Sequence, residues 1–160
     1  MSGCQVVSNR LPRLPAEIQQ RVGVVVRQTL AKIETRAKAS MTGPKHGRTY
    51  RKGRIGRRMS KSLAGLGLRT YTTAKGNTMA IVGYKMHRAS APGESPAVDT
   101  GALMNATRSR MVEPMKGIVY NNQAYAARLE LQMNRPFLGP AAQAESDGFV
   151  EAVKAEIGKL

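Results

Sequence analysis

The chain has 160 residues, which suffices for one domain, or for one domain and an arm. Its 26 Lys and Arg against 10 Asp and Glu give a formal charge of +16, and the 41% of apolar residues excludes a wholly disordered chain. No apolar run approaches the roughly 18 residues of a membrane span, and we expect no secretory signal at the N-terminus. The single Cys4 excludes an internal disulfide and a cysteine-based zinc site.

The N-terminal part of the sequence predicts an irregular arm followed by a long helix. We expect the arm over residues 1–14, because Pro12 and Pro15 disfavour a helix before that point. From Pro15, which suits a first helical position, apolar residues recur at spacings of three and four. These residues are Ile18, Val22, Val25, Val26, Leu30, Ile33 and Ala37. The run of small and turn-forming residues at 40–44 predicts the end of the helix.

The middle of the chain predicts a loop and a hairpin. Residues 44–67 are rich in Gly, Arg and Lys and show no clear period, so we expect a basic loop there. Residues 68–73 and 79–85 are rich in Thr, Tyr, Ile and Val and flank a short turn at 75–77. This pattern predicts a hairpin over 68–86, inserted into the domain.

The last third predicts an extended loop, two strands and two helices. Residues 87–101 are typical of a loop, and Asp99 or Thr100 could cap a short helix over 101–106. We expect strands at 111–112 and 117–120, then a helix over 123–131. A stiff turn at 135–140 precedes a closing helix. That helix has Phe149, Val153 and Ile157 on its inner face and Glu145, Glu151 and Lys154 outside. Together these elements predict a single α+β domain over residues 15–160, with an antiparallel sheet packed against the long N-terminal helix.

The sequence offers little support for an enzyme. His46 and His87 stand in basic segments away from any nucleophile motif, and the carboxylates are too scattered for an acid–base pair. The Gly65–Gly67 segment lacks the other residues of a phosphate-binding loop. The triplet Asp99-Thr100-Gly101 occurs in aspartic proteases, but here it follows a Pro-rich loop, and a helix cap explains it more simply. We therefore expect no catalytic residue, no metal and no cofactor.

Positive charge is concentrated in the middle of the chain. Residues 35–94 carry fourteen basic residues and one acidic residue, whereas residues 95–160 carry seven of each. The densest part holds Arg48, Arg51, Lys52, Arg54, Arg57, Arg58 and Lys61. Such a run suits the neutralisation of phosphates, and with Tyr50 as its sole aromatic it predicts sequence-independent backbone contact. An acidic protein neighbour would satisfy the same charges, and the sequence leaves both partners open.

Three segments in the second half of the chain resemble a known family. Residues 90–103 read SAPGESPAVDTGAL, residues 122–130 read NQAYAARLE, and residues 135–141 read RPFLGPA. In this order and spacing they resemble the head–tail connector family of tailed phages, also called neck or tail-completion proteins. Residues 34–38 and 47–53 also fit the family. Residues 54–86 look like an insertion relative to it, and Leu131-Gln132 replace its usual Phe-Gly.

The resemblance implies a non-enzymatic virion protein at the head–tail junction, synthesised in the host cytoplasm. Members of this family form homo-oligomeric rings that join the head portal to the tail and let DNA pass, and the resemblance implies the same for this chain. The partners implied are head-closure, tail-terminator or tail-tube proteins and non-specific contact with genomic DNA, with no membrane. The alternative interpretation is a sequence-independent nucleic-acid-binding module.

The family-like segments contain residues to which we assign a structural role. Of these we expect Tyr125, Leu129, Phe137 and Leu138 to belong to the core. The full set comprises Pro92, Gly93, Asp99, Thr100, Gly101, Leu103, Tyr125, Ala126, Leu129, Glu130, Arg135, Pro136, Phe137, Leu138 and Pro140.

Overall fold

A computed structural model describes residues 5–8 and 16–159 of the chain. The described residues form two compact units. The first, which we call the core unit, comprises the segments up to Lys45 and from Ser90 onward, and the second, the ribbon unit, comprises His46–Ala89. The sequence predicted one domain over residues 15–160. The structure differs because the strands of residues 46–89 pair only with one another.

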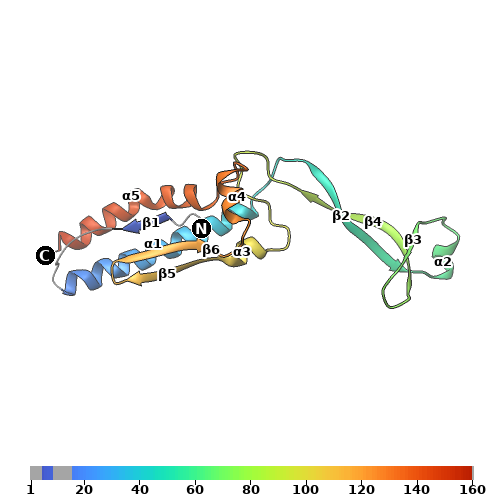
Figure 1. The fold of residues 1–160 in the computed structure, drawn as a ribbon, viewed down its shortest axis with the longest axis horizontal. Helices are drawn as coiled ribbons and strands as arrows, with labels where there is room; N and C mark the ends of the chain where they lie inside the picture. The colour runs from blue at the N-terminus through green and yellow to red at the C-terminus, as the bar shows by residue number, and fades with distance from the viewer. Residues whose placement is uncertain (1–4, 9–15, 160) are drawn as a thin grey trace. The chain divides into compact units, whose positions relative to one another are not determined.

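The core unit is an α+β fold, as the sequence predicted, with a three-stranded antiparallel sheet in the order β1-β6-β5. Figure 1 shows its two long helices, α1 and α5, running alongside this sheet. Its elements are β1 (Gln5–Ser8), α1 (Ala16–Thr42), α3 (Ala102–Ala106), β5 (Thr107–Glu113), β6 (Lys116–Asn121), α4 (Ala126–Leu131) and α5 (Leu138–Ile157).

Helix α1 is the centre of the core unit. All seven apolar residues of its predicted stripe are buried, and Met41 continues the stripe for one more turn. The sheet approaches α1 so closely that a Cβ atom on Gly117 would lie 2.0 Å from Leu30 Cδ1. On the helix itself, a Cβ atom on Gly23 would lie 2.5 Å from the carbonyl oxygen of Pro114. Glycine at these two positions therefore lets the helix and the sheet pack together.

Helix α5 packs against α1 along its length. Of its predicted inner stripe, Val153 is buried and Phe149 is partly buried against the core. Ile157 was predicted to be internal but is 39% exposed, because it is the last residue of the helix and lies beyond the packed turns. Glu145 was predicted to lie outside, yet its side chain is only 14% exposed and forms an ion pair with Arg36 of α1 at 2.6 Å.

The N-terminal segment is not irregular throughout. Residues 5–8 form β1, which pairs antiparallel with β6, placing Val6 opposite Ile118. The prediction of an irregular arm over 1–14 is therefore wrong for these four residues, because the edge of β6 offers backbone partners that the local sequence does not reveal. The rest of that predicted arm lies outside the described residues.

The ribbon unit is a second antiparallel sheet, in the order β2-β4-β3. The predicted hairpin is confirmed, since β3 (Thr70–Thr72) pairs with β4 (Thr78–Arg88). The predicted basic loop over 44–67 is wrong, because it contains strand β2 (Thr49–Arg58) and helix α2 (Lys61–Ala64). Strand β2 gains its backbone hydrogen bonds from β4, to which it pairs along its length with two register shifts.

The ribbon unit has almost no hydrophobic core. Within residues 46–89, all of which are described, Ala80 is the only buried residue. Apolar side chains such as Ile55, Val82 and Met86 are 43–58% exposed. Backbone pairing and short-range side-chain contacts therefore hold this unit together, rather than burial of apolar surface.

Candidate functional site

The ribbon unit carries most of the excess charge of the protein. Residues 46–89 contain eleven Lys and Arg and no Asp or Glu. The seven basic residues that the sequence predicted as a binding surface are all exposed there. Arg48 precedes β2 and Lys61 lies in α2, and the other five lie on β2, at Arg51, Lys52, Arg54, Arg57 and Arg58.

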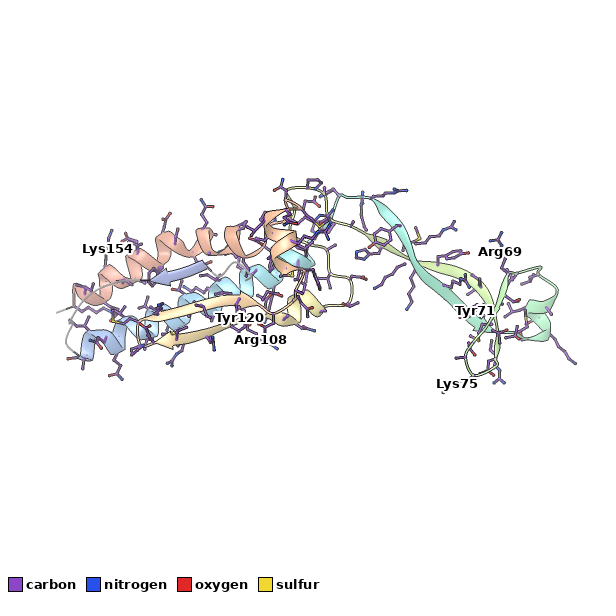
Figure 2. All side chains as sticks on the ribbon, viewed as in Figure 1. Arg69, Tyr71, Lys75, Arg108, Tyr120 and Lys154 are labelled. Atoms are coloured by element: carbon purple, nitrogen blue, oxygen red, sulfur yellow. The ribbon has the colours of Figure 1, made fainter. Side chains whose placement is uncertain are left out.

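Four further basic residues join this surface from outside the predicted segment. Strand β4 contributes Lys85 and Arg88, the turn before it contributes Lys75, and Arg69 precedes β3. Figure 2 labels Lys75 at the turn that joins β3 to β4 and Arg69 away from that turn, at the other end of β3. The absence of acidic residues from 46 to 89 was the signal that could have identified them, because it continues well past residue 61. We call the eleven cations together the basic surface.

Aromatic rings lie against the arginines of β2. The Arg51 guanidinium lies 4.5 Å from the centroid of the Tyr84 ring, and that of Arg54 lies 5.8 Å from the centroid of the Tyr71 ring. The Tyr50 ring meets the His87 ring edge-on, with centroids 5.3 Å apart. The sequence showed one aromatic near the basic run, but strand pairing brings Tyr71 and Tyr84 there as well. Cation–π contacts of this kind fix the direction of otherwise mobile arginines.

The base of the ribbon is closed by backbone hydrogen bonds. The N–H of Gly47 donates to the carbonyl of Ala89, and the N–H of Ala89 donates to the carbonyl of Arg48, both at 3.0 Å. The Nε–H of Arg88 donates to the Gly47 carbonyl at 3.3 Å. These bonds continue the β2–β4 ladder to the ends of the unit, so the two segments that enter and leave it are held side by side.

In the core unit, Lys45 ties the end of α1 to the Pro-rich loop. Its Nζ donates to the Ser40 carbonyl and to Ser95 Oγ, both at 2.8 Å, and Ser95 Oγ itself donates to the Ser40 carbonyl. Burial lowers the pKa of Lys45 below its ordinary value, and the nearby Glu94 carboxylate offsets part of that effect. A cation at this position also satisfies a carbonyl of the last helical turn, which has no partner within the helix.

Glu130 caps the N-terminus of α5. Its Oε2 accepts hydrogen bonds from the N–H groups of Phe137 at 2.8 Å and Leu138 at 3.3 Å. Its Oε1 accepts from the N–H of Gly139 at 2.8 Å. The next residue, Pro140, has no N–H to satisfy. The carboxylate thereby completes the first turn of the helix and places negative charge at the positive end of its dipole.

The Pro-rich loop, residues 89–101, is bound to the turn that precedes α5. The N–H of Gly93, a residue with φ of +85°, donates to the Asn134 carbonyl at 2.6 Å. Arg135 Nη1 donates to Oγ of the buried Ser90 at 2.9 Å. Two of the family-like segments, about forty residues apart, are thus joined by direct contacts, while Pro92 is exposed and the neighbouring Pro136 is half-buried.

The Asp99-Thr100-Gly101 triplet precedes α3, but the N-cap of this helix is Gly101, which has no side chain to cap it, so the prediction that Asp99 or Thr100 is the cap is wrong. Thr100 Oγ1 accepts a hydrogen bond from the N–H of Ala102 at 3.3 Å, and Gly101 has φ of +80°, a conformation that favours glycine. Asp99 is exposed. Leu103, within the helix, is buried in the core. The triplet therefore precedes a short helix that places the Leu103 side chain in the core.

A buried polar network behind α3 was not predicted from the sequence. Asn121 Nδ2 donates to the Leu103 carbonyl at 2.7 Å and to Thr107 Oγ1 at 2.8 Å, and Asn121 Oδ1 accepts from the N–H of Gln123. Thr107 Oγ1 in turn donates to the Leu103 carbonyl. Asn121 and Thr107 are both buried, and the network joins α3, β5 and β6. Only tertiary structure identifies it, because both residues are ordinary polar residues in the sequence.

The four predicted core residues of the second half differ in their burial, from fully buried through partly buried to exposed. Phe137 is 1% exposed, which confirms its prediction, and Ala126 is also buried. Leu129 and Leu138 are partly buried against the core. Tyr125 was predicted to be internal but is 44% exposed, because it stands at the start of α4 rather than on its inner face.

The described part of the chain contains no group of three or more metal-ligating His, Cys, Asp or Glu side chains. Among the described helices, none has the length and apolar character that crossing a membrane requires. Comparison of the chain with protein-family models, with curated proteins and with solved structures finds no match. The basic surface of the ribbon unit, with its eleven exposed cations and no acidic residue within 46–89, is the candidate site.

Proposed function

We propose that this protein is a structural component of the neck of a tailed phage, part of a homo-oligomeric ring that joins the head portal to the tail. The resemblance of three segments to the neck-protein family motivates this proposal. The core unit would form the wall of the ring and contact the neighbouring head-closure, tail-terminator or tail-tube proteins. The ribbon unit would bind DNA or an acidic neighbour.

The observation that carries the proposal is that hydrogen bonds join the family-like segments to one another and to the turn between them. Glu130 from the second segment caps the helix that the third segment begins, and Gly93 from the first bonds to the turn between them. Both residues bind backbone atoms. A motif whose residues hold a scaffold together is what a ring-forming structural protein needs, since fixed interface geometry lowers the entropy lost on assembly.

Inactivation of the gene in the phage that encodes it tests this role. We expect lysates that contain filled heads and complete but unattached tails, seen by negative-stain electron microscopy. Joined particles should return when the wild-type gene is supplied in trans. Normal joined particles from the inactivated phage would contradict the proposal.

A sequence-independent nucleic-acid-binding module is the second candidate, and the acid-free basic surface favours it. Such a module would be found on nucleic acid in the infected cell. The two candidates separate by location, because a neck protein is retained in purified, nuclease-treated particles and a free binding module is not.

A further inference from the structure

We propose that the ribbon unit binds duplex DNA through its sugar–phosphate backbone, with the β2–β4 ribbon lying along a groove. This inference names the partner of the basic surface and rests on the proposed neck function for the source of that DNA, the genome passing through the ring. The chemistry of the contact depends only on the ribbon unit itself.

Both faces of the ribbon are cationic. Consecutive residues of a strand point to opposite faces, so Arg57 and Arg58, paired in register with Ala80 and Met79, project on opposite sides. In β4, Lys85 and Arg88 are three residues apart and likewise occupy opposite faces. A surface that binds one flat acidic partner needs cations on one face only. A ribbon in a DNA groove lies between two phosphate backbones, so cations on both of its faces can bind phosphates.

The dimensions of the ribbon match those of a DNA groove. Strand β2 has ten residues, which at about 3.3 Å per residue extends over about 33 Å. That length is close to the helical repeat of B-DNA, about 34 Å. The major groove, about 12 Å wide, admits a two-stranded β-ribbon, and the sheet has two strands from Thr49 to Gly56, before β3 joins β4 opposite Arg57 and Arg58. Cations spaced along β2 could thus face successive phosphates on both sides of the groove.

The aromatic rings of the ribbon favour duplex over single-stranded DNA. Proteins that bind single strands without sequence preference stack unpaired bases on exposed aromatic rings. In the ribbon unit the Tyr84 and Tyr71 rings are occupied by Arg51 and Arg54, and the Tyr50 ring by His87. The Tyr71 and Tyr84 rings are half-buried beside these arginines, and Tyr50, although 45% exposed, meets His87 edge-on, whereas all eleven cations of the basic surface are exposed. Cations therefore outnumber exposed aromatic rings on this surface, which favours contact with phosphates over stacking of bases.

The distribution of charge favours DNA over an acidic protein. The buried centre of a specific protein interface is depleted of charge and enriched in large apolar anchors. The ribbon unit does expose Ile55, Val82 and Met86, but it also spreads eleven cations over its length, with no acidic residue that would pair with a protein partner in a fixed register. A surface of like charges fixes no single position for its partner. It therefore suits DNA, whose phosphates repeat evenly and which must move past the surface.

The test measures binding of the full-length protein to a 30-base-pair duplex by fluorescence anisotropy over a salt series. The test variant is Arg57→Gln/Arg58→Gln, which removes one cation from each face of β2. The matched control is Arg108→Gln/Lys154→Gln, which removes the same charge from exposed positions of the core unit (Figure 2).

We expect the test variant to weaken binding by about tenfold or more at about 0.1 M salt. The slope of log K against log salt should become shallower by about 1.8, which is about 0.9 for each of the two phosphates that the variant leaves without a cation. The control should retain wild-type affinity and slope.

Three results would overturn the inference. Equal losses in the test and control variants would mean diffuse attraction to the whole protein. Tighter binding to a single strand of equal charge would mean stacking. Tighter binding to a poly-glutamate peptide than to the duplex would assign the surface to an acidic protein. None of these results bears on whether the protein is found in particles, so failure here leaves the neck function standing, and absence from particles leaves a measured DNA affinity standing.

Discussion

The Oε1 atom of Glu130 accepts a hydrogen bond from the backbone N–H of Gly139 at 2.8 Å, which fastens the end of α4 to the start of α5. The same carboxylate also accepts the N–H groups of Phe137 and Leu138. A single side chain therefore satisfies the N–H groups at the start of α5 and fixes the position of the helix that packs on α1.

We expect Glu130→Gln to destabilise the protein by about 0.5–2 kcal/mol, because the amide loses the charge and one of the two acceptor oxygens at the helix N-terminus. Urea denaturation followed by circular dichroism measures this change. The matched control is Glu151→Gln on the exposed side of α5, where the carboxylate bonds Lys154 at 3.0 Å. Equal effects of the two substitutions would contradict the capping role.

The contact between β6 and α1 predicts a strong effect at one glycine. In Gly117→Ala the new methyl group would lie 2.0 Å from Leu30 Cδ1 and 3.1 Å from the Arg110 carbonyl oxygen. Overpacking of this kind costs about 1–3 kcal/mol, which the midpoint of thermal or urea unfolding would report.

Gly148→Ala serves as the control for that substitution. Gly148 lies within α5 with nothing within 4 Å of its added Cβ, so alanine there should stabilise the protein by up to about 1 kcal/mol. A neutral or stabilising Gly117→Ala would mean that the sheet does not approach α1 as described.

Glu34 predicts a defined dependence of stability on pH. Burial raises the pKa of its carboxyl group. Hydrogen bonds from Lys38 and from Ser109 lower this pKa, and their combined effect exceeds that of burial, so the pKa lies below its ordinary value. A folded pKa below the unfolded one gives stability that is present above the unfolded pKa and is lost as the pH falls through the folded pKa.

Comparison of the wild-type protein with Glu34→Gln tests that sign. The difference in unfolding free energy should be largest near about pH 7 and shrink below about pH 4, where the carboxyl group becomes protonated first in the unfolded and then in the folded protein. A difference that stays constant across this range would show that the carboxylate charge contributes nothing.

In the ribbon unit, a Cβ atom on Gly56 would lie 2.1 Å from the Tyr71 hydroxyl oxygen. We expect Gly56→Ala to loosen the β2–β4–β3 sheet and to speed hydrogen exchange of β2 amides by about tenfold or more, while exchange in α1 stays unchanged. The double variant Gly56→Ala/Tyr71→Ala should restore slower exchange because it removes the clash. If the double variant exchanges as fast as the single one, the contact with Tyr71 is not what limits the sheet.

Local periodicity explains which elements the sequence predicted well. The stripe from Ile18 to Ala37 follows the helical repeat residue by residue, and all of it is buried. Strand β6, predicted over 117–120, also alternates, with Gly117, Val119 and Asn121 buried and the residues between them half-buried. Strand β5 was predicted only at 111–112 but begins at Thr107. In α1 and β6 one face is covered by the core, so burial leaves a readable pattern in the sequence.

Strand β2 could not be predicted in the same way. It is exposed on both faces, so no alternation of apolar and polar residues marks it, and its partner β4 begins twenty residues after it ends. The contacts of the candidate site could not be predicted for the same reason. Arg51 contacts Tyr84 only because β2 pairs with β4, whereas the run of basic residues in the sequence shows the charge of the site but not which side chains meet.

The proposed place of the protein in the neck is tested most directly by its copy number in tailed particles. On the proposed function a tailed phage encodes the protein, and purified, nuclease-treated particles of that phage would be analysed by quantitative mass spectrometry, with the major tail-tube protein as internal reference. We expect a small fixed stoichiometry of about six to twelve copies per particle, as a closed ring requires. Absence from intact particles, or a copy number that varies with the preparation, would contradict the neck function.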